Sequence, residues 1–268
     1  MLLLLRRMLR RSAAAPRRSH RIASLGGEGR GEPRLQLSSS ERRAVQRAWQ
    51  LGPPREVLST IADQELTRSD AARLSGDCWL NDECVNVYCR LVGMTYPTCH
   101  VYSSLFYARL CETVAGFDYT GVRRWTRRVP GGVFERNVLL FPLNQANRHW
   151  TLAAVWPKER RMAYFDSLHC SPARVRQVRS TLLRYLEAEH RDKTGKPLPA
   201  GEWRMEVAVG TGETLQKDGS ACGAFAAAFC ALTAAGKTPP FGLHQAHVPA
   251  LRARILADSL AGKLTPLL

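Results

Sequence analysis

The sequence predicts an α+β fold, with a central mixed or antiparallel sheet flanked by helices. One observation is a pair of apolar segments, HWTLAAVW at 149–156 and MAYFDS at 162–167, which have the composition of neighbouring strands. The other is a set of segments that begin near residues 81, 171 and 222 and carry helix caps or helical composition. In a chain of 268 residues that is 45% hydrophobic, these segments indicate one folded domain from about residue 45.

The amino-terminal region is predicted to be a separate basic tail. Residues 1–40 hold nine arginines against two glutamates, so they carry +7 of the net charge of +16. This composition fits a solvated disordered tail, an organellar transit peptide, a nuclear address or an RNA-contacting arm. The apolar run at 2–5 is too short to span a membrane. The predicted regions are therefore a tail over 1–44 and a folded domain over 45–268, with no membrane span and with nucleic acid contacted only through the tail.

The segment WLNDECVNVYCRLVG predicts the first helix of that domain. Asn81 is a good N-cap residue, and Asp82 and Glu83 stand in the first turn, where the helix dipole favours acidic side chains. Trp79 lies just before the cap. We therefore expect a helix from residue 82, with an indole beside its amino-terminal end.

The two apolar segments predict contact between a histidine and a carboxylate. A short polar connection between strands implies an antiparallel hairpin. With the loop centred on Pro157 and Lys158, His149 at the start of one strand lies opposite Asp166 at the end of the other. Directly opposed side chains share a face, with Cβ atoms about 4.5–5.5 Å apart. We therefore expect the Asp166 carboxylate to accept a hydrogen bond from the His149 imidazole.

Three further segments complete the predicted core. A helix begins at Ser171 and Pro172, which are a favoured cap and a favoured first position. WRMEVAV at 203–209 alternates like a half-exposed strand, and HVPALRARILADSL at 247–260 predicts a terminal amphipathic helix. The apolar face of the helix that begins at Ser171 consists of Val175, Val178, Leu182, Tyr185 and Leu186.

Cys222 is the candidate nucleophile. The loop KDGSAC leads into GAFAAAFCALTAAG, a strong helix-forming segment that ends at Gly236. A cysteine at a helix amino terminus lies where partial positive charge stabilises a thiolate. Thiol catalysis needs such a cysteine, an imidazole that accepts its proton and a carboxylate that orients the imidazole.

The other cysteines suggest a reducing environment. The eight cysteines form no CxxC pair and no zinc-ligand spacing with histidine, and nothing indicates a secreted disulfide framework. We therefore expect no metal, no cofactor and an intracellular location in the nucleus or cytoplasm, with organellar targeting by the arginine-rich amino terminus as the alternative.

Four motifs together resemble a known family. They are WLND at 79–82, HW at 149–150, YFDSL at 164–168 and a glutamine six residues before the cysteine in QKDGSACG. In this order and spacing they resemble the ubiquitin-like-protein-specific cysteine proteases that process and remove SUMO, to which the adenoviral protease is related. The resemblance covers about residues 55–260 and implies a papain-like fold with the nucleophile at a helix amino terminus.

The resemblance also implies roles for single residues. Cys222 would be the nucleophile, His149 the general base and later the general acid, and Asp166 the carboxylate that orients His149. Gln216 would donate its side-chain amide to the oxyanion, together with the backbone N–H of Cys222.

Two indoles and one departure from the family pattern bear on the substrate. Trp79 and Trp150 resemble the indoles that close over the terminal diglycine of the substrate. Ala221 stands where cellular members usually have an aspartate, whereas the adenoviral branch resembles this chain there. The departure leaves the identity of the substrate open.

The implied function is that of a monomeric thiol isopeptidase that cleaves after the Gly-Gly terminus of a SUMO-like modifier. Within the same fold, the alternatives are a protease for a NEDD8-like or ubiquitin modifier and a related acetyltransferase. Outside the enzyme class, the alternatives are an inactive binding scaffold and a basic nucleic-acid-binding module. The bias of 33 arginines to 6 lysines favours the last only weakly, because genomic base composition can produce it.

Overall fold

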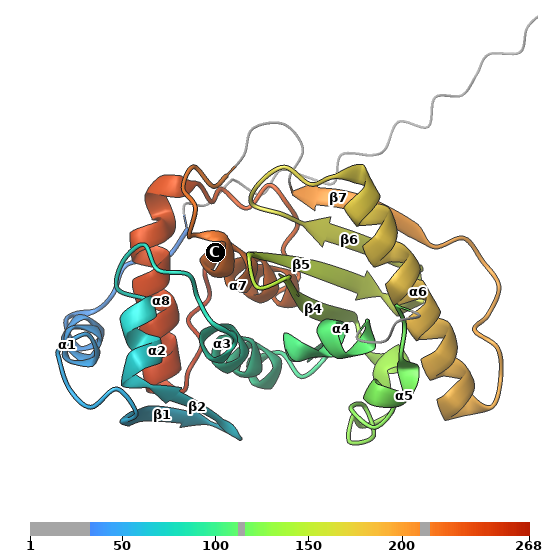
Figure 1. The fold of residues 1–268 in the computed structure, drawn as a ribbon, viewed down its shortest axis with the longest axis horizontal. Coiled ribbons are helices and arrows are strands. Elements are labelled where there is room, and N and C mark those ends of the chain that lie inside the picture. Colours follow the sequence, from blue (N-terminus) through green and yellow to red (C-terminus); the bar gives the residue numbers. More distant parts are fainter. Residues whose placement is uncertain (1–32, 112–115, 210–214) are drawn as a thin grey trace, which may run out of the picture. The chain divides into compact units, whose positions relative to one another are not determined.

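The structure is a computed structural model that describes residues 33–111, 116–209 and 215–268 (Figure 1). The basic tail predicted over residues 1–44 lies outside the described residues as far as residue 32. Among the described residues, no helix combines the length and the apolar character that crossing a bilayer requires.

A mixed sheet of five strands lies at the centre of the fold, in agreement with the predicted α+β class. The middle strands β4, β5 and β6 are antiparallel, whereas β3 and β7 run parallel to their neighbours at the two edges. In spatial order the strands are β3 (Cys99–Val101), β4 (Val138–Gln145), β5 (His149–Trp156), β6 (Arg161–Phe165) and β7 (Arg204–Val209).

Both faces of the sheet are buried, which explains why the sequence of β5 is almost continuously apolar. Trp150, Leu152 and Ala154 belong to the core on one face. Ala153 and Val155 belong to a second core on the opposite face. Because successive side chains of a strand point to opposite sides, each strand contributes to both cores.

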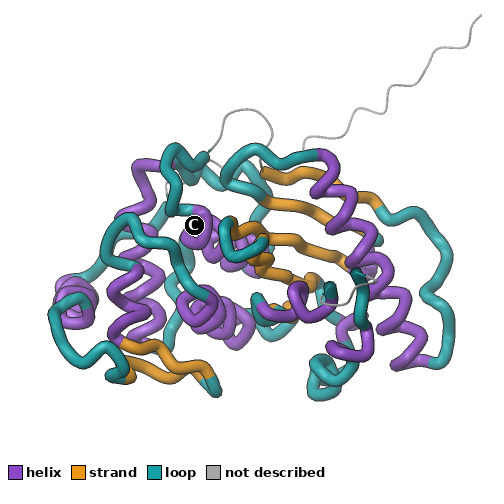
Figure 2. The backbone as a smooth tube through the Cα atoms, viewed as in Figure 1, coloured by secondary structure: helices purple, strands orange, loops and turns teal. Residues whose placement is uncertain are grey.

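Helices cover the two faces of the sheet (Figures 1 and 2). α3 (Asp82–Thr95), α7 (Cys222–Ala234) and α8 (Val248–Ala261) contribute to the first core. α4 (Leu105–Leu110) and α6 (Pro172–Thr194) contribute to the second. Every residue of α7 is buried, and its many alanines allow the neighbouring elements to approach its backbone closely. The helix that begins with Cys222 is therefore held on all sides.

The amino-terminal elements pack against α3 and α8. They are α1 (Ser39–Ala48), the antiparallel strands β1 (Val57–Ile61) and β2 (Gln64–Thr67), and the short helix α2 (Arg68–Arg73). Short elements later in the chain are α5 (Tyr119–Val122) and the 3-10 turns Val133–Glu135, Pro157–Glu159 and Gln245–His247.

α1 shows where the folded unit begins. Ser38 and Glu41 form a reciprocal capping box at its start, and the Glu41 carboxylate also pairs with Arg254 of α8 at 2.5 Å. Just before the helix, Leu35 is buried and the N–H of Arg34 donates to the carbonyl of Leu267. Residues 33–44 therefore belong to the folded unit, and its boundary lies earlier than the predicted one after residue 44.

The predicted helices are present with the predicted caps. Asn81 accepts a hydrogen bond from the N–H of Cys84 at the start of α3, and Ser171 accepts one from Arg174 at the start of α6. α7 ends just before Gly236, whose φ of 76° lies in the left-handed region that glycine adopts without strain. The strand predicted at 203–209 and the helix predicted at 247–260 correspond to β7 and α8.

The register predicted for the hairpin was wrong by two residues. Leu152 lies opposite Phe165, whereas a loop centred on Pro157 and Lys158 would place residue 163 there. The loop is longer than assumed because the 3-10 turn Pro157–Glu159 is followed by Arg160 in the left-handed conformation. A shift of two residues keeps every side chain on its predicted face, since the strand period is two.

Candidate active site

His149 and Asp166 meet at the ends of neighbouring strands. His149 is the first residue of β5, and Asp166 follows the last residue of β6. Nε2 of His149 lies 2.7 Å from Oδ1 of Asp166, so the predicted hydrogen bond is present despite the shifted register. The same carboxylate oxygen accepts the N–H of Leu168 at 2.9 Å. Asp166 is buried, which holds the carboxylate in one place.

Cys222 is the first residue of α7, as predicted. Its N-cap residue, Ala221, has no side chain that can bond the helix end, and Asp218 organises the preceding turn instead. Oδ1 of Asp218 accepts the N–H groups of Ser220 at 3.0 Å and of Ala221 at 2.9 Å. Oδ2 accepts the side-chain amide of Gln245 at 2.7 Å. Burial opposes ionisation of Asp218, but these hydrogen bonds prevail and lower its pKa.

The charge state of His149 follows from its surroundings. Burial alone would lower the pKa of His149, but its hydrogen bonds to Asp166 and Cys222 and their negative charges raise the pKa to about 9. The imidazole is therefore protonated at neutral pH. Because Nε2 bonds Asp166, Nδ1 is the ring nitrogen that remains for exchange of a proton with Cys222.

Gln216 is buried beside the same turn, at 2% exposure. Its Oε1 accepts the hydroxyl of Ser167 at 2.8 Å, which assigns the orientation of the amide. Its Nε2 donates to the carbonyl of Asp218, also at 2.8 Å. Ser167 follows Asp166 directly, so one short segment after β6 contains both the carboxylate that bonds His149 and the hydroxyl that bonds the predicted oxyanion donor.

The two predicted substrate-binding indoles differ in exposure. Trp79 is 49% exposed, and its Nε1 donates to the carbonyl of Gly219 at 2.8 Å. Trp150 is 4% exposed, and its Nε1 donates to the carbonyl of Leu80 at 2.9 Å. Both indoles therefore hold the segment that precedes α3 close to the site, and Trp79 presents a free face to solvent.

Gly223 allows that segment to approach α7. A Cβ at this position would lie 2.9 Å from Cβ of Leu80, which is closer than real Cβ contacts. The glycine after the cysteine thus makes room for the residue that follows Trp79.

Reasoning from the sequence missed three residues of this site. Asp218 and Ser167 act through hydrogen bonds that cross between loops, and Gly223 acts through its missing side chain. Asp218 had a local signal, because Asp-Gly-Ser before a helix is typical of a side chain that bonds the following backbone N–H groups. Ser167 and Gly223 had none that could be recognised without the neighbouring segments.

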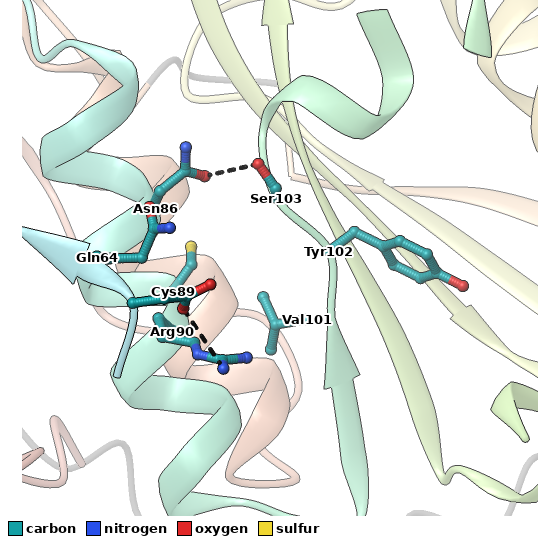
Figure 3. Close-up of a pocket in the computed structure, with 8 residues that line it drawn as sticks. Gln64, Asn86, Cys89, Arg90, Val101, Tyr102 and Ser103 are labelled. Atoms are coloured by element: carbon teal, nitrogen blue, oxygen red, sulfur yellow. Dashed lines mark hydrogen bonds and ion pairs between the residues drawn. The ribbon is translucent and has the colours of Figure 1, made fainter. Parts of the chain in front are cut away.

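A separate pocket lies between the β1–β2 hairpin, α3 and the segment after β3 (Figure 3). An ion pair between Arg90 and Asp63 and a hydrogen bond between Ser103 and Asn86 border it. None of the predicted site residues lines this pocket.

Comparison with known proteins agrees with this arrangement. Residues 78–262 match the profile of the Ulp1 protease family, C-terminal catalytic domain. A sentrin-specific protease of Caenorhabditis elegans is 30% identical over 226 residues, which are 82% of this chain and 30% of that protein. Sentrin-specific protease 3 of Mus musculus is 32% identical over 236 residues, which are 86% of this chain and 38% of that protein. The chain thus spans less than half the length of the curated relatives it matches first.

Solved structures share the fold. The C-terminal Ulp1 protease domain in complex with Smt3, the yeast ortholog of SUMO, superposes with a TM-score of 0.73 at 22% identity, covering 85% of this chain and 96% of that one. The catalytic domain of a Ulp1-like SUMO protease from Chaetomium thermophilum gives a TM-score of 0.69 at 24% identity, covering 87% and 94%. The predicted papain-like α+β fold is confirmed, and the chain belongs to the Ulp1 protease family.

Proposed function

We propose that the chain is a thiol protease and isopeptidase that cleaves after the C-terminal Gly-Gly of a SUMO-like modifier, in precursors and in conjugates. The observation that carries the proposal is the 2.7 Å hydrogen bond between His149 and Asp166 beside Cys222, at the start of a buried helix, in a chain of the Ulp1 protease family. The substrate class is supported by relatives named sentrin-specific proteases and by the Ulp1 domain solved in complex with Smt3.

In the first half of the reaction, Cys222 forms a thioester. The sulfur attacks the carbonyl carbon of the terminal glycine, while the thiol proton resides on Nδ1 of His149. The carbonyl oxygen becomes an oxyanion, which accepts hydrogen bonds from the amide of Gln216 and from the backbone N–H of Cys222. When the carbon–nitrogen bond breaks, His149 gives its proton to the leaving amine.

In the second half, water releases the modifier. Neutral His149 takes a proton from the water that attacks the thioester carbonyl, and the oxyanion forms at the same place. The carbon–sulfur bond then breaks, which returns the thiolate of Cys222 and leaves the modifier with a free carboxylate. Asp166 keeps the imidazole in one orientation through both halves and stabilises its charged form.

Recognition of the diglycine belongs to the two indoles. The exposed face of Trp79 lies beside the turn that leads to Cys222, where it can cover the substrate's C-terminal residues. Trp150 supports the floor of that site from the core. Glycine fits such a slot because it has no side chain, so larger residues are excluded.

The setting of this activity is part of the proposal. The eight cysteines in the described residues are all free, which suits a reducing compartment such as the nucleus or the cytoplasm. The chain would act as a monomer on a modifier and its conjugates, without metal or cofactor, and would contact nucleic acid only through the basic tail.

A panel of modifier probes tests the proposal. SUMO, NEDD8 and ubiquitin, each ending in an electrophile after Gly-Gly, are incubated with the protein and with a Cys222→Ser control. We expect covalent attachment of SUMO, and none in the control. Attachment of only NEDD8 or ubiquitin would assign a different modifier. Attachment of none, while Cys222 still reacts with a small alkylating agent, would favour the acetyltransferase or the scaffold.

A further inference from the structure

Two arginines on α8 are buried, Arg252 at 2% and Arg254 at 1% exposure. Arg254 has carboxylate partners, Glu41 at 2.5 Å and Asp258 at 3.0 Å. Arg252 makes no ion pair within the described part of the chain, and its guanidinium donates to three backbone carbonyls. Since a buried cation without a carboxylate partner is costly, its contacts call for an explanation.

The contacts of Arg252 join two segments that are far apart in the sequence. Nη1 donates to the carbonyl of Arg73, and Nη2 donates to the carbonyl of Cys78, each at 2.9 Å. Nη2 also donates to the carbonyl of Ser220 at 2.9 Å. The first two carbonyls belong to the segment that leads to Trp79, and the third belongs to the turn that leads to Cys222.

A second link crosses the same junction closer to solvent. Nε1 of Trp79 donates to the carbonyl of Gly219, and Nη1 of Arg73 donates to the carbonyl of Trp79 at 3.3 Å. Arg252 bonds neighbouring carbonyls from inside the core. The two links therefore hold the Trp79 segment (residues 73–79) and the Cys222 turn (residues 218–222) from opposite sides.

We propose that Arg252 is a positioning residue, which sets the distance between the substrate-covering indole and the nucleophile by tying the Trp79 segment to the Cys222 turn. The proposal rests on the function proposed above. Only a planar guanidinium suits the task, because its two terminal nitrogens reach three carbonyls at fixed angles. A lysine ammonium is a single point and cannot hold the same three acceptors.

The position of Ser220 also connects Arg252 to the nucleophile. Ser220 precedes Cys222 by two residues, so the hydrogen bond from Nη2 to the carbonyl of Ser220 fixes the turn that places the sulfur. Burial lowers the pKa of the Arg252 guanidinium, and the charge of Asp218 opposes this effect. Replacement of Arg252 should therefore weaken both substrate positioning and the reactivity of Cys222.

Arg254 supplies the matched control, because it is equally buried on the same helix and anchors α1 rather than the site. Arg252→Lys and Arg254→Lys are compared by melting temperature, by labelling with a SUMO electrophile probe, and by the rate at which iodoacetamide alkylates Cys222 between pH 5 and 9. For Arg252→Lys we expect probe labelling to fall by about tenfold to a hundredfold. We also expect slower alkylation at neutral pH. For Arg254→Lys, which should be destabilised to a similar extent, both rates should stay within about twofold of wild type.

Hydrogen exchange keeps the proposal testable if the lysine variant is too unstable. Arg252→Gln retains a neutral amide donor, and its exchange is measured at low temperature in the segments 73–79 and 218–224. Faster exchange confined to these two segments supports the role of Arg252. Wild-type protection there, or equal effects of the Arg252 and Arg254 variants on alkylation, would overturn it. If no modifier probe labels the wild type, the proposed function fails, while alkylation and exchange still decide the role of Arg252.

Discussion

His149 determines how the activity should depend on pH. Its pKa is raised from 6.5 to about 9, because the hydrogen bonds and charges of Asp166 and Cys222 outweigh the effect of burial. In the proposed mechanism the protonated imidazole gives its proton to the leaving amine, so cleavage should decline as the pH rises through about 9. In Asp166→Asn the carboxylate charge is lost, and the decline should move toward neutral pH. Rates of cleavage of a soluble fusion substrate between pH 6 and 10 measure both effects.

The raised pKa of His149 also makes the stability of the fold depend on pH. A group whose pKa is raised in the folded state stabilises the fold fully below its unfolded pKa, and this contribution is lost as the pH rises through the folded pKa. For His149 the window runs from 6.5 to about 9. The melting temperature of wild type should therefore fall across this window more than that of His149→Gln. Parallel curves for the two proteins would contradict the assignment of charge to His149.

Gln216 and Ser167 should separate oxyanion stabilisation from binding. Gln216→Ala removes the proposed side-chain donor to the oxyanion, so the rate of the chemical step should fall by about 10²–10³ while modifier binding stays the same. Ser167→Ala leaves the amide in place but removes the hydroxyl that orients it at 2.8 Å, so the loss should be about tenfold. Single-turnover rates and binding of a modifier to Cys222→Ala versions of each variant distinguish the two effects. A loss of binding equal to the loss of rate would show that Gln216 contacts the ground state.

At the level of single elements, Gly223 gives a test of the packing at the start of α7. Alanine is normally favoured over glycine inside a helix by about 1 kcal/mol. Here the added Cβ would meet Cβ of Leu80 at 2.9 Å, so we expect Gly223→Ala to destabilise the protein by about 1–3 kcal/mol and to displace the segment that carries Trp79. Urea unfolding and probe labelling are the measurements.

Gly93 of α3 is the control for that variant. A Cβ there would meet the side chain of Val101 at 3.5 Å, an ordinary contact. Gly93→Ala should therefore stabilise the protein by up to about 1 kcal/mol and leave labelling unchanged. If both variants are stabilising, the close contact between α7 and Leu80 does not constrain the site.

The elements that could be predicted from the sequence are those whose signal is local. The cap of α3, the start of α6 and the bounds of β5 follow from residues within each segment. The predicted register of β5 and β6 was wrong because it depends on a turn with Arg160 in the left-handed conformation. The residue types of this turn do not predict that conformation. The hydrogen bond between His149 and Asp166 is still present, because a shift of two residues leaves both side chains on their predicted face of the sheet.

The features that escaped prediction depend on segments that meet only after folding. α1 has a local capping box, but its first residues, 39–44, were assigned to the basic tail because of the charge of that region. Two of the three carbonyls that Arg252 bonds, and the space that Gly223 leaves, are set by elements about 140 to 180 residues away. Composition and periodicity carry no information about such contacts.

At the level of the whole molecule, two truncations test where the folded unit begins. Removal of residues 1–32 should leave the melting temperature and turnover of a soluble substrate nearly unaltered, and change only cellular location or salt-sensitive binding, as the basic composition suggests.

Removal of residues 1–48 also deletes α1, which exposes the surface under Leu35 and Val45 and leaves Arg254 without Glu41. Glu41 is itself partly exposed and Arg254 keeps Asp258, so loss of this ion pair costs less than loss of a fully buried one. Together with the apolar burial lost at Leu35 and Val45, it should lower the melting temperature by roughly 10 °C. Glu41→Gln in the full chain should reproduce part of this drop. Because the hydrogen bond from Arg254 lowers the pKa of Glu41 from 4.5 to about 2, the difference should be full above pH 4.5 and disappear as the pH falls to about 2. A shorter protein that keeps its stability without α1 would place the start of the folded unit after residue 48, and loss of turnover on removal of residues 1–32 alone would show that the basic tail takes part in capture of the substrate.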